Sequence, residues 1–470
     1  MTLGAIIAAN RFGLGARPGE LRDIGGDARG WLLKQIMNAR PAPRELSGLA
    51  SSAEAFQLFA EALRRRRQER NAAPSEKEVK GDDKPRMENE PREKLAAIYL
   101  EQVAARYRIA VRTEEPFRER LVHFWTNHFA VSADKAQVAG LAGALENEAV
   151  RPNVAGRFED LLLAVESHPA MIFYLDNQAS IGPSSLLAQR AAKRAKGNPK
   201  LDINENLARE ILELHTLGVD GGYSQKDVTT FALALTGWSI ANGRGKESER
   251  VGQFQFREQV HEPGAKSILG KSYKDDGVAQ PRAVLHDLAM HPATATHVAT
   301  KLARHFIADQ PPRSAVERLA KVFRDTEGDL PSLHRALVEC PEAWEQVSTK
   351  FKTPHDYVVS TFRMLDFIPP QPRQILAPFQ QLGQRPYTPG SPAGWPDTAS
   401  QWDGPDALLK RIEWATAVGK RVGSNVHPLD VGTQSLGSAL SERTRVAISR
   451  AESGAQGMAL LLASPEFQRR

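Results

Sequence analysis

Apolar residues recur at intervals of three and four along most of this 470-residue chain, and this spacing limits its possible folds more than any other feature. Side chains at that spacing share one face of a helix and can pack against a core. Helices are predicted at 28–39, 53–68, 92–112, 115–130, 137–150, 157–166, 204–217, 224–236, 281–290, 293–308, 314–326, 331–339, 354–366, 404–421 and 453–464. The sequence therefore predicts a mostly α fold, a multi-helix body.

Alternation typical of strands is confined to 252–270. There Phe254 and Phe256 alternate with polar residues, a turn follows at 262–264, and a second short apolar run returns at 267–269. This pattern predicts one small β-hairpin inserted between helices.

The chain is long enough for two or three domains, at about 150 residues per domain. We predict a main helical domain at 1–350 and a C-terminal helical subdomain at 351–470 packed on it. Within the main domain, 64–94 combines runs of charge with three prolines and almost no large apolar residue. Such a segment buries too little apolar surface to order itself, so we predict a disordered insert there.

Composition excludes several classes of protein. A single cysteine, Cys340, excludes a disulfide framework and a cysteine-rich metal site. No apolar run approaches the ~20 residues that cross a bilayer. The first residues lack the features of a secretory signal, which predicts a cytoplasmic location, with export to the periplasm alongside a partner as the alternative. The net charge of +6 is not gathered beside aromatic residues, so nucleic-acid binding is not expected.

The segment 204–217 is the strongest candidate for a functional site. As a helix it would carry its leucines on one face and a dense polar set on the other, made of Glu205, Asn206, Arg209 and Glu210. We expect Glu205 or Glu210 to act as acid or base, while Asn206 and Arg209 orient substrate oxygens. The alternative is a surface ion-pair ladder, because Glu205 and Arg209 are four residues apart.

Two histidines fall on the packing faces of their predicted helices. His215 lies among the leucines of 204–217, and His128 lies with Phe117 and Phe124 on 115–130. Either each is a core histidine hydrogen-bonded to a backbone carbonyl or carboxylate, or the two meet across a helix interface and support catalysis.

On the other face of 115–130, His123 and Asn127 are candidate substrate-binding residues. Neither Glu-x-x-His nor His-Glu-x-x-His occurs near these residues, so no protein-bound metal is predicted, and no motif indicates a cofactor.

Two further segments are candidates for ligand binding. The helix at 293–308 places Lys301 and Arg304 on a cationic face that suits a carboxylate, phosphate or sulfate, with an ordinary exposed face as the alternative. The irregular stretch 384–397, rich in proline and glycine, presents Trp395 either to a ligand or to the core that it covers.

Distinctive short blocks occur along nearly the whole chain. They are RFGLG at 11–15, HFWTNHF at 123–129, YLDN at 174–177, NENLARE at 204–210, LHTLGV at 214–219, ALTGW at 234–238, HPATA at 291–295, KFKTPH at 350–355 and SPAGWP at 391–396. In order and number they resemble the bacterial family known as domain of unknown function 1800. The resemblance implies a mainly helical protein, but no mechanism. It also implies a neighbour, since members are often encoded beside a family similar to sulfatases and phosphatases.

Two functions are compatible with these residues. The first is a hydrolase acting on an anionic or carbohydrate-like substrate, a small molecule or a glycan, with a site of Glu, Asn, Arg and His. The second is a non-catalytic accessory or binding protein for a sulfatase-like or phosphatase-like partner. An enclosed pocket lined by the candidate residues favours the first, and a flat exposed face favours the second.

Overall fold

The structure, a computed structural model, describes residues 2–37, 40–72, 90–194, 202–241, 250–345, 350–423 and 426–470. It confirms a mostly α fold with only small antiparallel sheets among these residues. No helix in the described ranges is both long and apolar enough to cross a membrane.

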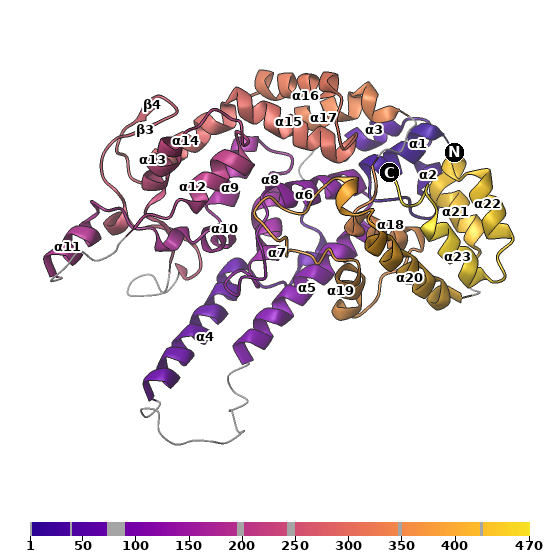
Figure 1. The fold of residues 1–470 in the computed structure, drawn as a ribbon, viewed down its shortest axis with the longest axis horizontal. Coiled ribbons are helices and arrows are strands. Elements are labelled where there is room, and N and C mark those ends of the chain that lie inside the picture. Colours follow the sequence, from indigo (N-terminus) through magenta and orange to yellow (C-terminus); the bar gives the residue numbers. More distant parts are fainter. Residues whose placement is uncertain are drawn as a thin grey trace.

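Some helices are joined by short turns and others by longer stretches, such as 236–278, which contains the strands, and 382–404 (Figure 1). The first part of the chain forms α1 (Leu3–Ile7), α2 (Glu20–Ile24), α3 (Ala28–Leu33), α4 (Ser52–Ala72), α5 (Glu90–Arg112), α6 (Pro116–His128), α7 (Ala142–Leu145), α8 (Arg151–Asn153), α9 (Phe158–Glu166), α10 (Pro169–Tyr174), α11 (Leu186–Arg194), α12 (Asn206–Glu210) and α13 (Gln225–Leu235). The second part forms α14 (Ala279–Met290), α15 (Pro292–Phe306), α16 (Arg313–Asp325), α17 (Leu330–Glu339), α18 (Pro354–Met364), α19 (Pro372–Gln381), α20 (Pro405–Val422), α21 (Pro428–Leu436), α22 (Glu442–Ser449) and α23 (Gly454–Ala463).

Helix α6 lies at the centre of the molecule and is buried on nearly all sides. Its start is set by Pro116 at the first helical position, where the missing N–H costs no hydrogen bond. Phe117, Leu121 and Trp125 pack into the core, and the polar side chains of Arg120 and His123 are buried as well. A helix buried all round must find partners for such groups inside the protein. Those partners form the site described below.

The predicted strand at 254–256 is present, but its predicted partner is wrong. β2 (Phe254–Phe256) pairs antiparallel with β1 (Trp238–Ile240), while β3 (Lys266–Ile268) pairs with β4 (Lys271–Tyr273). Leu269 and Gly270 join β3 to β4 with φ values of 51° and 77°. Two residues with positive φ make the tight turn of a two-residue hairpin, so the run at 267–269 turns back on itself instead of reaching 254–256.

The predicted insert at 64–94 falls partly outside the described residues. α4 continues to Ala72 and α5 begins at Glu90, and the two helices pack side by side as they project from the body (Figure 1). The residues 73–89 are not described. The predicted boundary near 351 stays a prediction; α18 and α19, which follow it, both pack against α5.

One buried arginine joins the N-terminal segment to α5 and α18. Arg363 on α18 is fully buried, and its Nε donates to the carbonyl of Gly15 at 2.7 Å. Its Nη1 donates to the carbonyls of Ala110 and Val111 at 2.9 and 3.1 Å, and its Nη2 pairs with Glu20 at 2.9 Å. A planar guanidinium can satisfy several acceptors at once, which lysine cannot do in the same geometry.

Replacing Arg363 by methionine should therefore destabilise the protein strongly. The change leaves the Glu20 carboxylate and several buried carbonyls without a partner, which costs about 3–5 kcal/mol of unfolding free energy. Urea denaturation measures the loss. Arg313→Met is the matched control, because its ion pair with Glu317 is exposed and should not contribute measurably. An equal effect of the two substitutions would contradict this role for Arg363.

Candidate functional site

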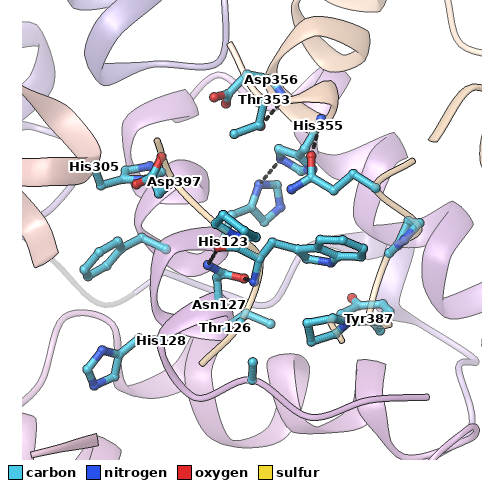
Figure 2. Close-up of a pocket in the computed structure, with 18 of the residues that line it drawn as sticks. His123, Thr126, Asn127, His128, His305, Thr353, His355, Asp356, Tyr387 and Asp397 are labelled. Atoms are coloured by element: carbon cyan, nitrogen blue, oxygen red, sulfur yellow. Dashed lines mark hydrogen bonds and ion pairs between the residues drawn. The ribbon is translucent and has the colours of Figure 1, made fainter. Parts of the chain in front are cut away.

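A cavity of about 490 Å³ lies beside α6, between α15, the start of α18 and the irregular segment 384–398 (Figure 2). We call it the central pocket. The ionisable side chains that line it are Arg106, Tyr107, Arg120, His123, His128, Lys301, Arg304, His305, His355, Asp356, Tyr387 and Asp397. Its volume falls in the range of pockets that hold small molecules.

Helix starts with clear sequence signals place several of these side chains. Thr353 caps α18 by accepting a hydrogen bond from the N–H of Asp356, and Pro354 occupies the first helical position. His355 and Asp356 therefore lie in the first turn of α18, where both line the cavity. In the same way His291 caps α15 before Pro292, which sets the phase that carries Lys301, Arg304 and His305 to the pocket.

The structure brings six of the sequence-predicted residues to the central pocket. They are His123, Asn127, His128, Lys301, Arg304 and Trp395. It does not bring the predicted residues of the 204–217 segment there, namely Glu205, Asn206, Arg209, Glu210 and His215.

The polar face of 204–217 is engaged in a different arrangement. Glu205 pairs with Arg209 at 2.9 Å and accepts hydrogen bonds from Gln225 and Thr229 on α13 at 2.9 and 2.6 Å. The side chains of Glu205 and Arg209 are 28% and 37% exposed. This is the surface ion-pair arrangement expected as the alternative, with further hydrogen bonds to α13. The segment 204–217 is therefore not the candidate functional site.

His215 and His128 take part in buried contacts between helices. His215 Nδ1 lies 2.7 Å from Glu166 Oε1, and both side chains are fully buried. His128 Nε2 donates to the carbonyl of His215 at 3.1 Å. Burial lowers the pKa of His128 well below its ordinary value, so its ring is neutral. The two histidines therefore approach each other across a helix interface, with His215 held by a carboxylate of α9.

The predicted helix at 204–217 is not α-helical throughout, because a π-helical turn follows the polar residues 205–210. α12 ends at Glu210, and Ile211–His215 continues it with wider turns, in which the N–H of Leu217 bonds to the carbonyl of Leu212 at 3.0 Å. Each such turn contains more residues than an α-turn, so the following side chains rotate relative to the α-helical phase.

Asn127 lines the central pocket, but its amide is already used. Its Nδ2 donates to the carbonyl of Trp395 at 2.9 Å, and its Oδ1 accepts from the N–H of Trp395 at 2.8 Å. Gly394, with φ of 83°, lets the backbone pass this close: a Cβ there would lie 2.3 Å from the carbonyl oxygen of Asn127. Asn127 thus fixes the 384–398 wall of the pocket.

His305 and Asp397 form a pair in the pocket that their positions in the sequence did not predict. His305 Nδ1 lies 2.7 Å from Asp397 Oδ2, and the two side chains are seen together at one side of the cavity in Figure 2. Burial lowers the pKa of His305, although Asp397 opposes the shift. Burial alone would raise the pKa of Asp397, but His305, Lys350 and Arg470 outweigh it and hold that pKa below its usual range. The neutral imidazole therefore donates its Nδ1–H to a carboxylate, which leaves the lone pair on Nε2.

A second carboxylate, Asp356, is held by two arginines. Arg120 Nη1 lies 2.9 Å from Asp356 Oδ1, and Arg470 Nε lies 2.9 Å from Asp356 Oδ2. Arg470 also donates to the carbonyl of His305 at 2.9 Å. Arg120 Nη1 reaches His305 Nε2 at 3.4 Å. These contacts fix the orientation of His305 relative to the cavity.

A chain of hydrogen-bonding side chains runs along the other side of the pocket. Glu119 Oε1 lies 3.2 Å from His123 Nε2, His123 Nδ1 lies 3.1 Å from His355 Nε2, and His355 Nδ1 lies 3.1 Å from the hydroxyl of Tyr107. Figure 2 shows the contact between the two histidines. Burial lowers the pKa of His123 to about 3 and that of His355 well below its ordinary value.

Among the described residues, Glu119, His123 and Glu146 lie close enough to share a metal ion. Both carboxylates are already bound by guanidinium groups: Glu119 by Arg151 at 2.5 and 2.9 Å, and Glu146 by Arg106. A cation would have to displace these arginines from a buried site, so the donor set fits arginine better than a metal.

Comparison with known proteins gives one match. The family model described as "Protein of unknown function (DUF1800)" matches residues 7–469. No curated protein and no solved structure gives a significant match. What the protein does must therefore be inferred from the residues of the central pocket.

Gly394→Ala should loosen the pocket wall, since the new Cβ would collide with the Asn127 backbone and amide and the positive φ would be strained. We expect faster amide exchange at Trp395 and easier proteolysis within 384–398. Gly390→Ala is the control in the same segment, because a Cβ at Gly390 meets no atom within 4 Å and its φ is not positive. Equal protection in the two variants would show that the wall does not depend on this close approach.

Proposed function

The chain belongs to the family described as protein of unknown function, DUF1800, and within it we propose that this protein binds an anionic small molecule in the central pocket and hydrolyses it. The observation that carries the proposal is the presence of two cations without a carboxylate partner, Lys301 and Arg304, beside the His305–Asp397 pair on the same wall.

The two cations differ from the other charged groups that line the pocket. Within the described ranges, neither Lys301 nor Arg304 lies within 4.0 Å of a carboxylate oxygen. Among the residues that the structure describes, the Arg304 guanidinium makes one hydrogen bond, from Nε to the carbonyl of Asp309 at 3.3 Å. Unpaired cations in a partly buried cavity are stabilised by an anionic ligand, and arginine suits the oxygens of carboxylate and phosphate groups in particular.

His305 can act as a general base toward water. Its Nε2 faces Arg120 Nη1 at 3.4 Å, which is long for a hydrogen bond. In the proposed step, a water molecule replaces Arg120 as the partner of Nε2, while Arg120 keeps its ion pair with Asp356. The water oxygen attacks the electrophilic centre of the bound ester while its proton passes to Nε2. The ester bond then breaks, and the leaving oxygen takes up the proton. Asp397 stabilises the imidazolium formed in between.

A second candidate, an accessory protein for a sulfatase-like or phosphatase-like partner, is favoured by a different feature. Leu408, Leu409 and Ile412 on α20 are 39%, 55% and 52% exposed. Exposed apolar residues on one helix are typical of protein–protein contacts. Leu409→Glu together with Ile412→Glu should abolish association with such a partner, measured by co-purification from the native host, and should leave turnover unchanged. An unaltered association would remove this candidate.

Substitutions in the pocket separate binding from chemistry. Lys301→Met and Arg304→Met should each weaken anion binding by about tenfold, which corresponds to one charge-assisted hydrogen bond. His305→Asn should leave binding within a factor of about three and lower turnover by about 10²–10⁴-fold, the usual contribution of a general base.

Turnover is measured on 4-nitrophenyl esters of phosphate, sulfate and carboxylic acids, and binding by calorimetry with the non-hydrolysed members of that set. Lys321→Met, an exposed lysine of α16, is the control for loss of a positive charge. Full activity of the His305 variant would exclude His305 as the base.

Anion binding should also depend on pH through Lys301. Burial and, after it, the charge of Arg304 lower the pKa of Lys301, while Asp397 opposes them; together they bring it to about 8. The amine is charged below about pH 8 and neutral above it, so the affinity should fall as the pH rises through 8. Lys301→Arg, which stays charged, should bind with nearly constant affinity between pH 7 and 9. The same pH dependence in both proteins would assign the titration to another group.

A further inference from the structure

We propose that the group bound at Lys301 and Arg304 is a dianion of the phosphate monoester class, in preference to a sulfate monoester, a monocarboxylate or a neutral glycan. This inference rests on the proposed function of the central pocket and specifies that its substrate carries two negative charges. It follows from counting the positive and negative charges among the residues that form the cavity wall.

The charges on the Tyr107 side of the pocket cancel. Arg106 lines the cavity and pairs with Glu146, and Arg151 behind it pairs with Glu119 through two contacts of 2.5 and 2.9 Å. Arg151 also lies 3.4 Å from Glu146. Two guanidinium groups and two carboxylates form one closed, buried cluster that leaves no net charge for a ligand.

The charges around the His305–Asp397 pair also cancel. Asp356 is shared by Arg120 and Arg470, and Asp397 is approached by Lys350 at 3.4 Å and Arg470 at 3.8 Å. The remaining carboxylate of the cluster, that of Asp309, lies 2.6 Å from Lys350 Nζ. Three cations and three carboxylates therefore neutralise one another.

The histidines of the pocket add no charge near neutral pH. Burial lowers the pKa of each of the four, His123, His128, His305 and His355. Their hydrogen bonds agree with neutral rings. If His123 donates from Nε2 to Glu119, its Nδ1 can accept from His355 Nε2, and His355 Nδ1 can accept from the hydroxyl of Tyr107.

Two other buried cations lie behind the wall. Lys352 donates to Ser360 at 3.0 Å and lies over the ring of Phe467, while Arg411 donates to Gln468 at 2.7 Å. Neither lines the cavity. They can only add to the positive potential there.

Among the described residues that line the cavity, two positive charges remain without a carboxylate partner, those of Lys301 and Arg304, one helical turn apart on α15. Burial and, after it, repulsion by Arg304 lower the pKa of Lys301. A dianionic group neutralises both. A monoanion leaves one cation unpaired in a partly desolvated site, and a neutral glycan leaves two. A phosphate monoester, with a second pKa near 6, carries about two negative charges at pH 7.5, whereas a sulfate monoester of the same shape carries one.

The test compares two probes of nearly equal size, 4-nitrophenyl phosphate and 4-nitrophenyl sulfate, with the full-length protein at pH 7.5. Both dissociation constants are measured by calorimetry with His305→Asn, which slows hydrolysis during the titration. We expect the phosphate ester to bind at least tenfold more tightly. Equal affinities, tighter binding of the sulfate ester, or no binding of either would overturn the proposal.

Variants that remove a positive charge then test whether the preference for the phosphate ester over the sulfate ester depends on Lys301 and Arg304. Lys301→Met in the same background should reduce the preference for phosphate to less than threefold, because the site then carries one uncompensated charge. Lys321→Met should keep the full preference, and thermal melting checks that each variant is folded. A preference that survives in Lys301→Met would overturn the assignment.

Failure of the proposed hydrolase function can be distinguished from failure of the proposed dianion site. If the phosphate ester binds preferentially and the protein with native His305 does not hydrolyse it, the dianion site stands and the hydrolase fails. If both esters are hydrolysed with equal affinity, the hydrolase stands and the dianion site is overturned.

Discussion

Two carboxylates, the buried Asp356 and the partly buried Asp397, connect the segments that enclose the central pocket. Asp356 at the start of α18 meets Arg120 of α6 and Arg470, and Asp397 meets His305 of α15 and Lys350. The ions of this network have lost most of their contact with water, so each depends on the others for neutralisation. Removing one member would leave a partner charge buried and alone. The same ion pairs that stabilise the segments around the central pocket also orient His305. The stability of the pocket wall and the proposed chemistry of the pocket therefore depend on the same contacts.

The arrangement also separates structural cations from those that we propose bind a ligand. Arg106, Arg120 and Arg363 are matched by carboxylates or carbonyls inside the protein and act as cross-links between distant segments. Lys301 and Arg304 have no such carboxylate among the described residues. In the function that we propose, that difference makes two side chains of one helix attract the anion, while equally charged neighbours contribute little to binding.

The outcome for 204–217 shows where reasoning from sequence reached its limit. The spacing correctly grouped the polar residues of this segment, and it raised the alternative in which Glu205 pairs with Arg209, which the structure shows. It could not detect the π-helical turn at Ile211–His215, because that turn is decided by packing around it. In contrast, Lys301 and Arg304 reach the pocket as a simple helical wheel predicts, since α15 is regular from Pro292 to Phe306.

The sequence by itself determined the mostly α class, the start of α15 and α18 at proline and capping residues, and the cationic face of α15. These depend on residues within one or two helical turns of each other, so local spacing and capping chemistry are enough to predict them. Only the tertiary structure decided that His305 meets Asp397, that Asn127 holds Trp395, and which cations are already neutralised. Those contacts join residues far apart in the chain, and the burial that gives them their strength exists only once the helices have packed together.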